Sequence, residues 1–333
     1  MELLAALPQI HLNNLIFLLY FAASLQICPL LLALMIDLLL GEPPRAVHPV
    51  VWMGKIISIW ERFTPAHGAR SQLVYGGGMA LPTTFIFTSP AYLLLVYMKE
   101  VSPIVYIIVG ASLLKSALSF RELRRSALEI KAFLTKDNLN EARSKMPALV
   151  SRETQSLGKP ALASATMESV AENACDSFVA PLFYFLLFGV PGAIAYRVVN
   201  TLDAMIGYHG KYEYLGKVAA RLDDILNFIP ARISGLLLVI AAHLYKKDSK
   251  NAWQVMLRDH GKTASPNAGW PMSAMAGALR TRFEKKGCYC LGDANNPLSS
   301  QLIASGVKLA DISALLWVLL CLIVEVMYFA FVA

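Results

Sequence analysis

The sequence predicts an all-α fold, a polytopic integral membrane helical bundle with broken or re-entrant helices and cytoplasmic helical loops. Composition is the first observation behind this prediction. Hydrophobic residues make up 56% of the 333 residues and charged residues only 16%, whereas soluble domains carry about 25% charged residues. The second is that the apolar residues gather into long runs separated by polar stretches. The third is a run interrupted by glycine and proline, which favours a broken helix. We expect one membrane-embedded domain spanning residues 1–333.

Six apolar segments are expected to cross or enter the membrane, at about residues 15–40, 79–98, 104–120, 178–199, 229–245 and 310–333. The first has no Lys or Arg before Arg45 and is too long for the apolar core of a signal peptide, so we interpret it as a transmembrane helix. The second and third are joined by a short turn and form an antiparallel hairpin. Gly189 and Pro191 break the fourth, and the fifth is shorter than a full span.

The remaining segments are polar or amphipathic. Residues 45–63 carry two tryptophans, which favours an amphipathic helix at the membrane surface over the alternative, a helix that binds a ligand. The glycine run 76–78 indicates either a flexible start of the second apolar segment or close helix packing. Residues 121–165 are a polar helical loop. Residues 246–308 are a polar loop that contains a small-residue helix at 272–279.

Charge predicts the orientation. Both polar loops have an excess of Lys and Arg, which places them in the cytoplasm by the positive-inside rule. We favour a topology in which the fourth and fifth apolar segments dip into the membrane without crossing, because all polar clusters then share one cytoplasmic face of a multi-pass cell-membrane protein. The net charge of +7 suits an anionic lipid surface or an anionic substrate equally. We expect the lipid bilayer as a partner, and no nucleic acid.

The most informative stretch is residues 164–232, where carboxylates, amides and arginines alternate with strongly apolar sequence. Read as a helix, Glu168, Glu172 and Asp176 are four residues apart and form one acidic stripe. Unpaired acidic groups beside a membrane segment cost several kcal/mol, so the stripe should meet a metal, an Arg or a cationic ligand. The other candidate residues of the stretch are Asn173, Asn200, Asp203, Arg221, Asp223, Asp224, Asn227 and Arg232.

Four polar residues outside this stretch are further candidates. His48 precedes a proline and is either a ligand contact or an ordinary structural histidine. Arg152, flanked by hydroxyl residues, either holds a phosphate or belongs to a helix cap. Ser265 and Asn267 lie in a loop whose N–H groups and hydroxyls suit phosphate. The Gly-Lys-Thr at 261–263 is not a P-loop, because the glycine required five positions earlier is missing.

A structural role is the alternative for each group taken alone. Ion pairs such as Arg221 with Asp223, or Arg152 with Glu168, can fix the register of buried helices. Asn173 and similar amides often hydrogen-bond between membrane helices. Seven carboxylates and amides near one apolar element exceed what packing requires, so we favour a site.

Four sequence blocks also carry a resemblance. They are DLLLGEPPRAVHPVVWMG, SRETQSLGKPALASATMESVAENACDSFVAPLFYFLLFGVPG, NTLDAMIGYHGKYEYLGKVAARLDDILNFIPARISG and SPNAGWPMSAMAGAL. In this order they resemble the blocks of the cobalamin-biosynthesis amide synthase family, the adenosylcobinamide-phosphate synthases. The resemblance covers most of the chain, from about Asp37 to about Leu291. Glu42 and Glu153 stand where Asp is expected, and both keep the charge.

The resemblance implies an integral membrane acid-amine ligase. Members of this family join aminopropanol or its O-phosphate to the free propionate carboxylate of adenosylcobyric acid, with ATP as co-substrate, and form adenosylcobinamide or its phosphate. The resemblance leaves open which amine is used and whether the carboxylate is activated as an acyl phosphate or an acyl adenylate. It also leaves open whether subunits form a homo-oligomer or a complex with other membrane cobalamin-assembly enzymes.

The resemblance supplies no residue roles, so these rest on chemistry. ATP and a corrinoid carboxylate are both anionic and repel each other. Enzymes commonly offset such repulsion with Mg²⁺ and basic side chains. We therefore assign Asp223 and Asp224 to Mg²⁺, because hard oxygen ligands suit that ion. The basic and polar residues assigned to phosphate or substrate are His48, Arg152, Asn173, Asn200, Arg221, Asn227, Arg232, Ser265 and Asn267.

The catalytic candidates are Glu168, Glu172, Asp176 and Asp203. Glu168 or Glu172 would take a proton from the attacking ammonium, because the neutral amine is the nucleophile. Without the resemblance, two other classes stay open. Asp223-Asp224-x-x-Asn227 faintly resembles the motif of a Mg²⁺-dependent prenyltransferase. A membrane transporter would also use broken helices with acidic residues, although its usual paired repeat is not found in the sequence.

Overall fold

The computed structural model describes residues 26–332 apart from 67, 151, 209 and 211. In this part the chain is helical except for one short hairpin. The helices are α2 (Ile27–Leu39), α3 (Pro49–Arg62), α4 (Ala69–Val101), α5 (Pro103–Ala117), α6 (Phe120–Thr135), α7 (Leu139–Lys145), α8 (Lys159–Ala174), α9 (Ala180–Ile206), α10 (Lys217–Leu226), α11 (Phe228–Leu244), α12 (Ser249–Asp259), α13 (Gly269–Leu279) and α14 (Ser300–Val332). Short 3₁₀ turns lie at Met146–Ala148 and His260–Lys262, and a π-helix at Cys175–Val179.

Four helical stretches within the described residues are long and apolar enough to cross a membrane. They are Ala69–Val101, Pro103–Thr135, Lys159–Ile206 and Ser300–Tyr328. A fifth is present if α10 and α11, which meet at a bend of 49°, count as one broken span. The predicted polytopic helical bundle is therefore confirmed. Of the first predicted segment, only α2 lies within the described residues.

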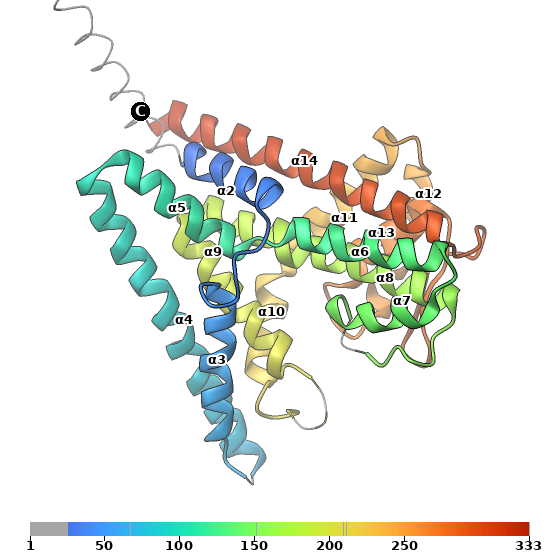
Figure 1. The fold of residues 1–333 in the computed structure, drawn as a ribbon, viewed down its shortest axis with the longest axis horizontal. Helices are drawn as coiled ribbons and strands as arrows, with labels where there is room; N and C mark the ends of the chain where they lie inside the picture. Colours follow the sequence, from blue (N-terminus) through green and yellow to red (C-terminus); the bar gives the residue numbers. More distant parts are fainter. Residues whose placement is uncertain (1–25, 67, 151, 209, 211, 333) are drawn as a thin grey trace, which may run out of the picture.

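The helices form two groups that run in different directions (Figure 1). Helices α2, α5, α6 and α14 follow the long axis of the molecule, whereas α3, α4 and α10 run away from it. Helix α9 connects the groups, because it packs on α5 and also on α3, α4 and α10. Helix α13 lies in the core against α11 and α12, and all its residues except Trp270 are buried.

Close packing explains one of the glycines between the two groups. Helix α4 begins at Ala69, so the glycine run 76–78 lies inside the helix and the flexible start that the sequence allowed is wrong. The other interpretation, close packing, holds at Gly76. A side chain there would overlap the backbone oxygen of Leu215, just before α10.

The region between α8 and α9 is broken twice. The π-helix at Cys175–Val179 follows α8, and Gly189 interrupts α9 with φ 66° and ψ −161°. Glycine is required at such a dihedral because other residues are strained at positive φ. The predicted break at Gly189 is confirmed, while the π-helix was not predicted.

The segment 246–308 is more ordered than a polar loop. It contains α12, α13 and a hairpin of β1 (Phe283–Lys285) and β2 (Tyr289–Leu291), which pair with Phe283 opposite Leu291. The predicted small-residue helix is the buried α13, and it makes a compact fold possible because its small side chains let neighbouring helices approach.

Candidate functional site

A cavity of about 380 Å³ brings together carboxylates from three parts of the stretch 164–232. We call it the acidic cavity. Its walls come from the end of α8, the π-helix, the end of α9, α10, the start of α11 and the loop before α13. The polar residues that line it are Glu172, Asp176, Asp203, Tyr208, Asp223, Asp224, Asn227, Ser265 and Asn267.

Asp223 is held by side-chain amides from two helices. The amide of Asn227 donates to one carboxylate oxygen at 2.9 Å, and that of Asn200 donates to the other at 3.3 Å. The Tyr196 hydroxyl in turn donates to Asn227 at 2.9 Å, and Asn227 is buried at the bend between α10 and α11. These amides orient Asp223 without neutralising its charge.

Asp224 joins the cavity to the loop before α13. The Asn267 amide donates to the backbone oxygen of Asp224 at 2.7 Å, and the Ser265 hydroxyl donates to its carboxylate at 3.4 Å. Arg221 is 3.5 Å from the same carboxylate but is largely exposed. Arg232 does not line the cavity. Its guanidinium stacks on the Phe228 ring, 3.5 Å from the ring centre.

A buried aspartate fixes the start of that loop. Asp259 is fully buried and accepts hydrogen bonds from the Arg258 guanidinium and from the Gly292 backbone, each at 2.8 Å. Burial alone would raise the pKa of Asp259, but these hydrogen bonds and one from Lys262 lower it to about 2. These hydrogen bonds hold the end of α12 in place, and the loop that carries Ser265 follows it.

The acidic cavity has little positive charge to balance its carboxylates. Among the described residues, Glu172, Asp176, Asp203 and Asp223 have no basic nitrogen within 4.0 Å. Arg197, which is partly buried, hydrogen-bonds to Asn200 at 3.2 Å. Unpaired carboxylates in a buried setting favour an incoming cation.

The oxygen donors of the cavity suit Mg²⁺ only together with ligands from outside the protein. No group of three or more His, Cys, Asp or Glu side chains in the described part of the chain is arranged to hold a metal ion by itself. Mg²⁺ is commonly held by one or two carboxylates, with waters and substrate phosphates completing its shell. Asp223 and Asp224, beside a cavity with room for such a ligand, fit that second arrangement.

Glu168 lies outside the acidic cavity, although it belongs to the same sequence stripe. It accepts hydrogen bonds of 2.6 Å from both Ser164 and Tyr289, and Arg152 is 3.3 Å away. Burial and the neighbouring Glu168 charge raise the pKa of Tyr289, so its phenol keeps the proton that it donates. Glu168 is thus partnered on both carboxylate oxygens, whereas Glu172, one turn later, has no hydrogen bond or ion pair with any described residue.

A smaller cavity of about 120 Å³ lies between Glu168 and Glu172. We call it the connecting cavity. Arg152, Lys285 and Tyr289 also line it, and Glu172 lines both it and the acidic cavity. The structure therefore divides the predicted stripe, with Glu172 and Asp176 facing the acidic cavity and Glu168 bound to the hairpin.

Five of the sequence candidates line neither cavity: His48, Asn173, Asn200, Arg221 and Arg232. Asn173 hydrogen-bonds one turn back along its own helix, to Ser169 at 2.8 and 3.0 Å. His48 caps α3 by accepting from the Val50 N–H at 3.2 Å, and its other ring nitrogen is 2.8 Å from Glu42. This position agrees with a structural role for His48, because both nitrogens of its ring contact protein groups.

Glu42 and His48 belong to a buried ion-pair network, which we call the Lys115 network. Lys115, only 3% exposed, lies 2.9 Å from Asp37 and 3.0 Å from Glu42. Burial would raise the pKa of Glu42, but the His48 hydrogen bond and the Lys115 charge together lower it to about 2. This network ties the segment after α2 to α5.

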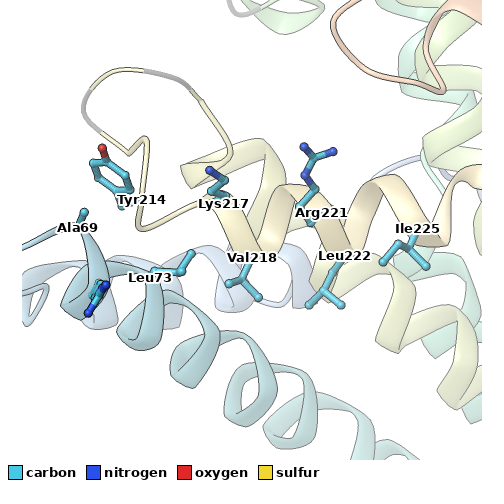
Figure 2. Close-up of a pocket in the computed structure, with 9 residues that line it drawn as sticks. Ala69, Leu73, Tyr214, Lys217, Val218, Arg221, Leu222 and Ile225 are labelled. Carbon is cyan, nitrogen blue, oxygen red and sulfur yellow. The ribbon is translucent and has the colours of Figure 1, made fainter.

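A separate groove of about 440 Å³ lies between α4 and α10. Figure 2 shows that Val218, Leu222 and Ile225 line it from one side of α10, while Arg221 points away from them. Leu73 of α4 forms the opposite wall. This groove has no acidic side chain among its lining residues, so α10 presents its apolar side here and its carboxylates to the acidic cavity.

Comparison with known proteins agrees with the sequence blocks. The model of the CobD/Cbib protein family matches residues 30–320. The chain belongs to the CobD/CbiB family. The match includes the residues of the acidic cavity and of the Lys115 network.

Relatives in this family are similar over nearly their whole length. A cobalamin biosynthesis protein CobD from Dehalococcoides mccartyi is 51% identical over 303 residues, which are 91% of this chain and 98% of the relative. A probable cobalamin biosynthesis protein CobD from Methanothermobacter thermautotrophicus is 42% identical over 88% of this chain and 96% of its own. No solved structure matches the chain.

Sequence reasoning missed several residues around these cavities. Ser164, Cys175, Tyr196, Lys285 and Tyr289 all line a cavity or hold a residue that does. Tyr289 contacts Glu168, which lies 121 positions earlier in the chain, and no local sequence pattern predicts such a contact. The basic composition of residues 282–286 was the only available signal, and it was used for topology alone.

Proposed function

We propose that this CobD/CbiB family member acts in cobalamin biosynthesis as an ATP-dependent acid-amine ligase. It would attach aminopropanol or its phosphate to the free propionate carboxylate of adenosylcobyric acid. The relatives' names support the pathway, and the sequence blocks support the reaction by resemblance. The single structural observation that supports it is the acidic cavity, where four carboxylates lack basic partners and therefore favour a cationic ligand such as Mg²⁺ with a nucleotide.

Asp223 and Asp224 are the residues we assign to Mg²⁺. Asp223 keeps a fixed orientation through Asn200 and Asn227, while Asp224 is held by the loop before α13. When bound, Mg²⁺ and ATP supply the activated phosphate chemistry that turns a carboxylate into an electrophile. Asp176 and Asp203 line the same cavity and add negative charge that attracts the cation.

Glu172 is the better of the two candidate bases. It has no hydrogen-bond or ion-pair partner among the described residues and lies where the acidic and connecting cavities meet. Glu168 already accepts two short hydrogen bonds and pairs with Arg152, so both of its carboxylate oxygens are engaged. We infer that Glu172 takes the proton from the attacking ammonium and that Glu168 positions Arg152 and Tyr289.

The direct test uses purified full-length protein in detergent with adenosylcobyric acid, ATP and Mg²⁺. Aminopropanol and its phosphate are supplied in separate reactions, and mass spectrometry follows the corrinoid product and the released nucleotide. We expect a corrinoid amide whose formation requires ATP. Release of ADP or AMP will distinguish activation by a phosphate from activation by an adenylate. Absence of an amide product with either amine would overturn the proposal.

Two parallel assays test the other function classes. Turnover of a prenyl diphosphate would support the prenyltransferase alternative, and uptake by proteoliposomes without ATP would support a transporter. The predicted cytoplasmic location of the site is tested by labelling a Lys285→Cys variant in intact and opened cells. We expect labelling with a membrane-impermeant reagent only after the cells are opened.

A further inference from the structure

A third cavity, of about 890 Å³, lies beside the connecting cavity. We call it the basic cavity. Three parts of the chain build it: the segment 152–161 that leads into α8, the hairpin residues 281–286, and the loop 294–298. Its volume is within the range of pockets that hold small-molecule ligands.

The charge of the basic cavity is opposite to that of the acidic cavity. Its lining contains Arg152, Arg282, Lys285 and Lys286, and the only carboxylate among its lining residues, Glu284, is paired with Arg282 at 2.9 Å. Neither Lys285 nor Lys286 has a carboxylate within 4.0 Å among the described residues. The cavity therefore keeps a net positive charge that no described side chain balances.

Arg152 adds a donor that has no protein partner. One of its terminal nitrogens pairs with Glu168, while its Nε is buried and makes no hydrogen bond. A guanidinium with one side engaged and one free is suited to an oxygen anion, because its donors form a planar fork. Buried donors of this kind are rarely left without a partner in a complete complex.

The start of α8 reinforces this positive field. Gly158, Pro160 and Ala161 line the basic cavity, and the helix N-cap at Gly158 has no side-chain cap. The first N–H groups of a helix and its dipole favour an anion at this end. This contribution adds to the four cations and is not needed to define the cavity.

The three cavities adjoin one another through shared residues. Arg152 and Lys285 line both the basic and the connecting cavities, and Glu172 lines both the connecting and the acidic cavities. The basic cavity is therefore one cavity away from Glu172. The basic cavity, suited to an anion, and the acidic cavity, suited to a cation, are therefore separated by the connecting cavity.

We propose that the basic cavity is the binding site for the phosphate of a phosphate-bearing substrate, with Lys285, Lys286 and Arg152 as its ligands. The identity of that substrate as a reactant of amide synthesis rests on the function proposed above. The binding itself follows from the charge and the cavity alone. Two sources of the phosphate have the same chemistry, a small amino alcohol phosphate and a nucleotide.

The test measures binding without turnover. Isothermal titration calorimetry on the full-length protein in detergent uses inorganic phosphate, aminopropanol phosphate and a non-hydrolysable ATP analogue with Mg²⁺, each alone and without a corrinoid. A Lys285→Gln/Lys286→Gln variant removes two cations from the cavity. We expect at least a tenfold weaker affinity for one or more of the probes, and an affinity of the wild-type protein that falls as salt rises.

Two further variants serve as controls. Lys136→Gln/Lys250→Gln removes the same charge at exposed positions outside the cavity, and should bind within about twofold of the wild-type protein. Lys285→Arg/Lys286→Arg keeps the charge and should retain binding. Thermal unfolding in the same detergent checks that each variant is folded.

The outcomes separate the sources and the two proposals. Selective loss of the amino alcohol phosphate assigns the cavity to the amine substrate, and selective loss of the ATP analogue assigns it to the nucleotide. Unchanged affinity of the Lys285→Gln/Lys286→Gln variant for every probe, or no binding of any probe by the wild-type protein, overturns the assignment. Since no amide is formed in these measurements, failure of the ligase assay leaves this result standing by itself.

Discussion

The Lys115 network and the acidic cavity both bury carboxylates, but they treat the charge differently. In the network, Asp37 and Glu42 lie within 3.0 Å of the Lys115 ammonium, and His48 completes the set. In the acidic cavity, Asp223 is oriented by neutral amides and no basic nitrogen of the described residues lies within 4.0 Å of it.

This difference indicates different roles for the carboxylates of the Lys115 network and those of the acidic cavity. A carboxylate paired with a protein cation is internally satisfied and serves to hold elements together. A carboxylate oriented by amides but left charged retains its attraction for a cation from solution. The sequence contains acidic residues in both places, so the partner decides which role a residue has.

The largest expected effect is in the Lys115 network. A Lys115→Met substitution leaves Asp37 and Glu42 without their shared cation, and we expect it to lower the free energy of unfolding by about 3 to 5 kcal/mol. Unfolding in mixed detergent micelles measures the change. Lys99→Met, at an exposed position near the end of α4, is the control and should have little effect.

A second substitution sharpens this prediction. Asp37→Asn added to Lys115→Met removes one of the unpaired charges and should recover part of the lost stability. If Lys115→Met alone unfolds at the wild-type temperature, the network does not hold these elements together.

The acidic cavity should behave in the opposite way. We expect Asp223→Asn to reduce amide formation at least about hundredfold at limiting Mg²⁺, because the charge that attracts the cation is lost. Its thermal unfolding temperature should stay at or above that of the wild-type protein, since repulsion among the carboxylates falls. Initial rates and unfolding scans are measured on the same preparations.

The matched control for this variant is Glu100→Gln, which removes an exposed carboxylate at the end of α4. Its rate should equal that of the wild-type protein. An Asp223→Asn protein that turns over normally at limiting Mg²⁺, or one that unfolds many degrees earlier, would make Asp223 a structural residue like Asp37.

The pH dependence of stability tests the network through Glu42. The folded-state pKa of Glu42 is about 2, below its ordinary 4.5. A lowered carboxyl pKa stabilises the fold above pH 4.5, and this stabilisation is lost as the pH falls from 4.5 through about 2. We expect the contribution to be about 2 kcal/mol, after allowance for the partial exposure of the side chain.

The measurement compares unfolding temperatures of the wild-type and Glu42→Gln proteins between pH 7 and pH 3. The difference between them should be greatest at pH 7 and shrink as the wild-type carboxylate takes up a proton. A difference that does not vary with pH would mean that the charge of Glu42 has no part in the effect of the substitution.

The smallest effect is expected at Tyr289, whose neutral hydroxyl donates a hydrogen bond to the buried carboxylate of Glu168. Tyr289→Phe removes the 2.6 Å hydrogen bond to Glu168 and should cost about 1 kcal/mol of stability. Tyr328→Phe, at an exposed site on α14, is the control for loss of a hydroxyl. Equal unfolding temperatures for the two variants would contradict a role for this bond.

Local sequence patterns predicted much of the fold. Long apolar runs predicted the membrane helices, because a span must bury its backbone polar groups in helical hydrogen bonds. Gly189 was recognised as a break, since glycine followed closely by proline disfavours a continuous helix. The ends of the helices were less predictable: α4 begins ten residues before its apolar core, and only the structure shows that Gly76 in this part packs against the distant backbone of Leu215.

The candidate site was predicted in part. Glu172, Asp176 and Asp203 were expected to gather with Asp223 and Asp224, and the structure brings them to one cavity. Their chemical roles remain predictions. The helical spacing also grouped Glu168 with them, and it could not reveal that the hairpin supplies Tyr289 to that residue.

The sequence by itself determined that this is a helical membrane protein of the CobD/CbiB family with more acidic groups near apolar helices than packing needs. These properties follow from composition, periodicity and block order, which are local or additive along the chain. Only the tertiary structure decided which carboxylates have a cation, because Lys115 reaches back 73 residues to Glu42 and the basic hairpin folds onto α8. Partnership between charges depends on distance in space, and the order of residues along the chain does not contain it.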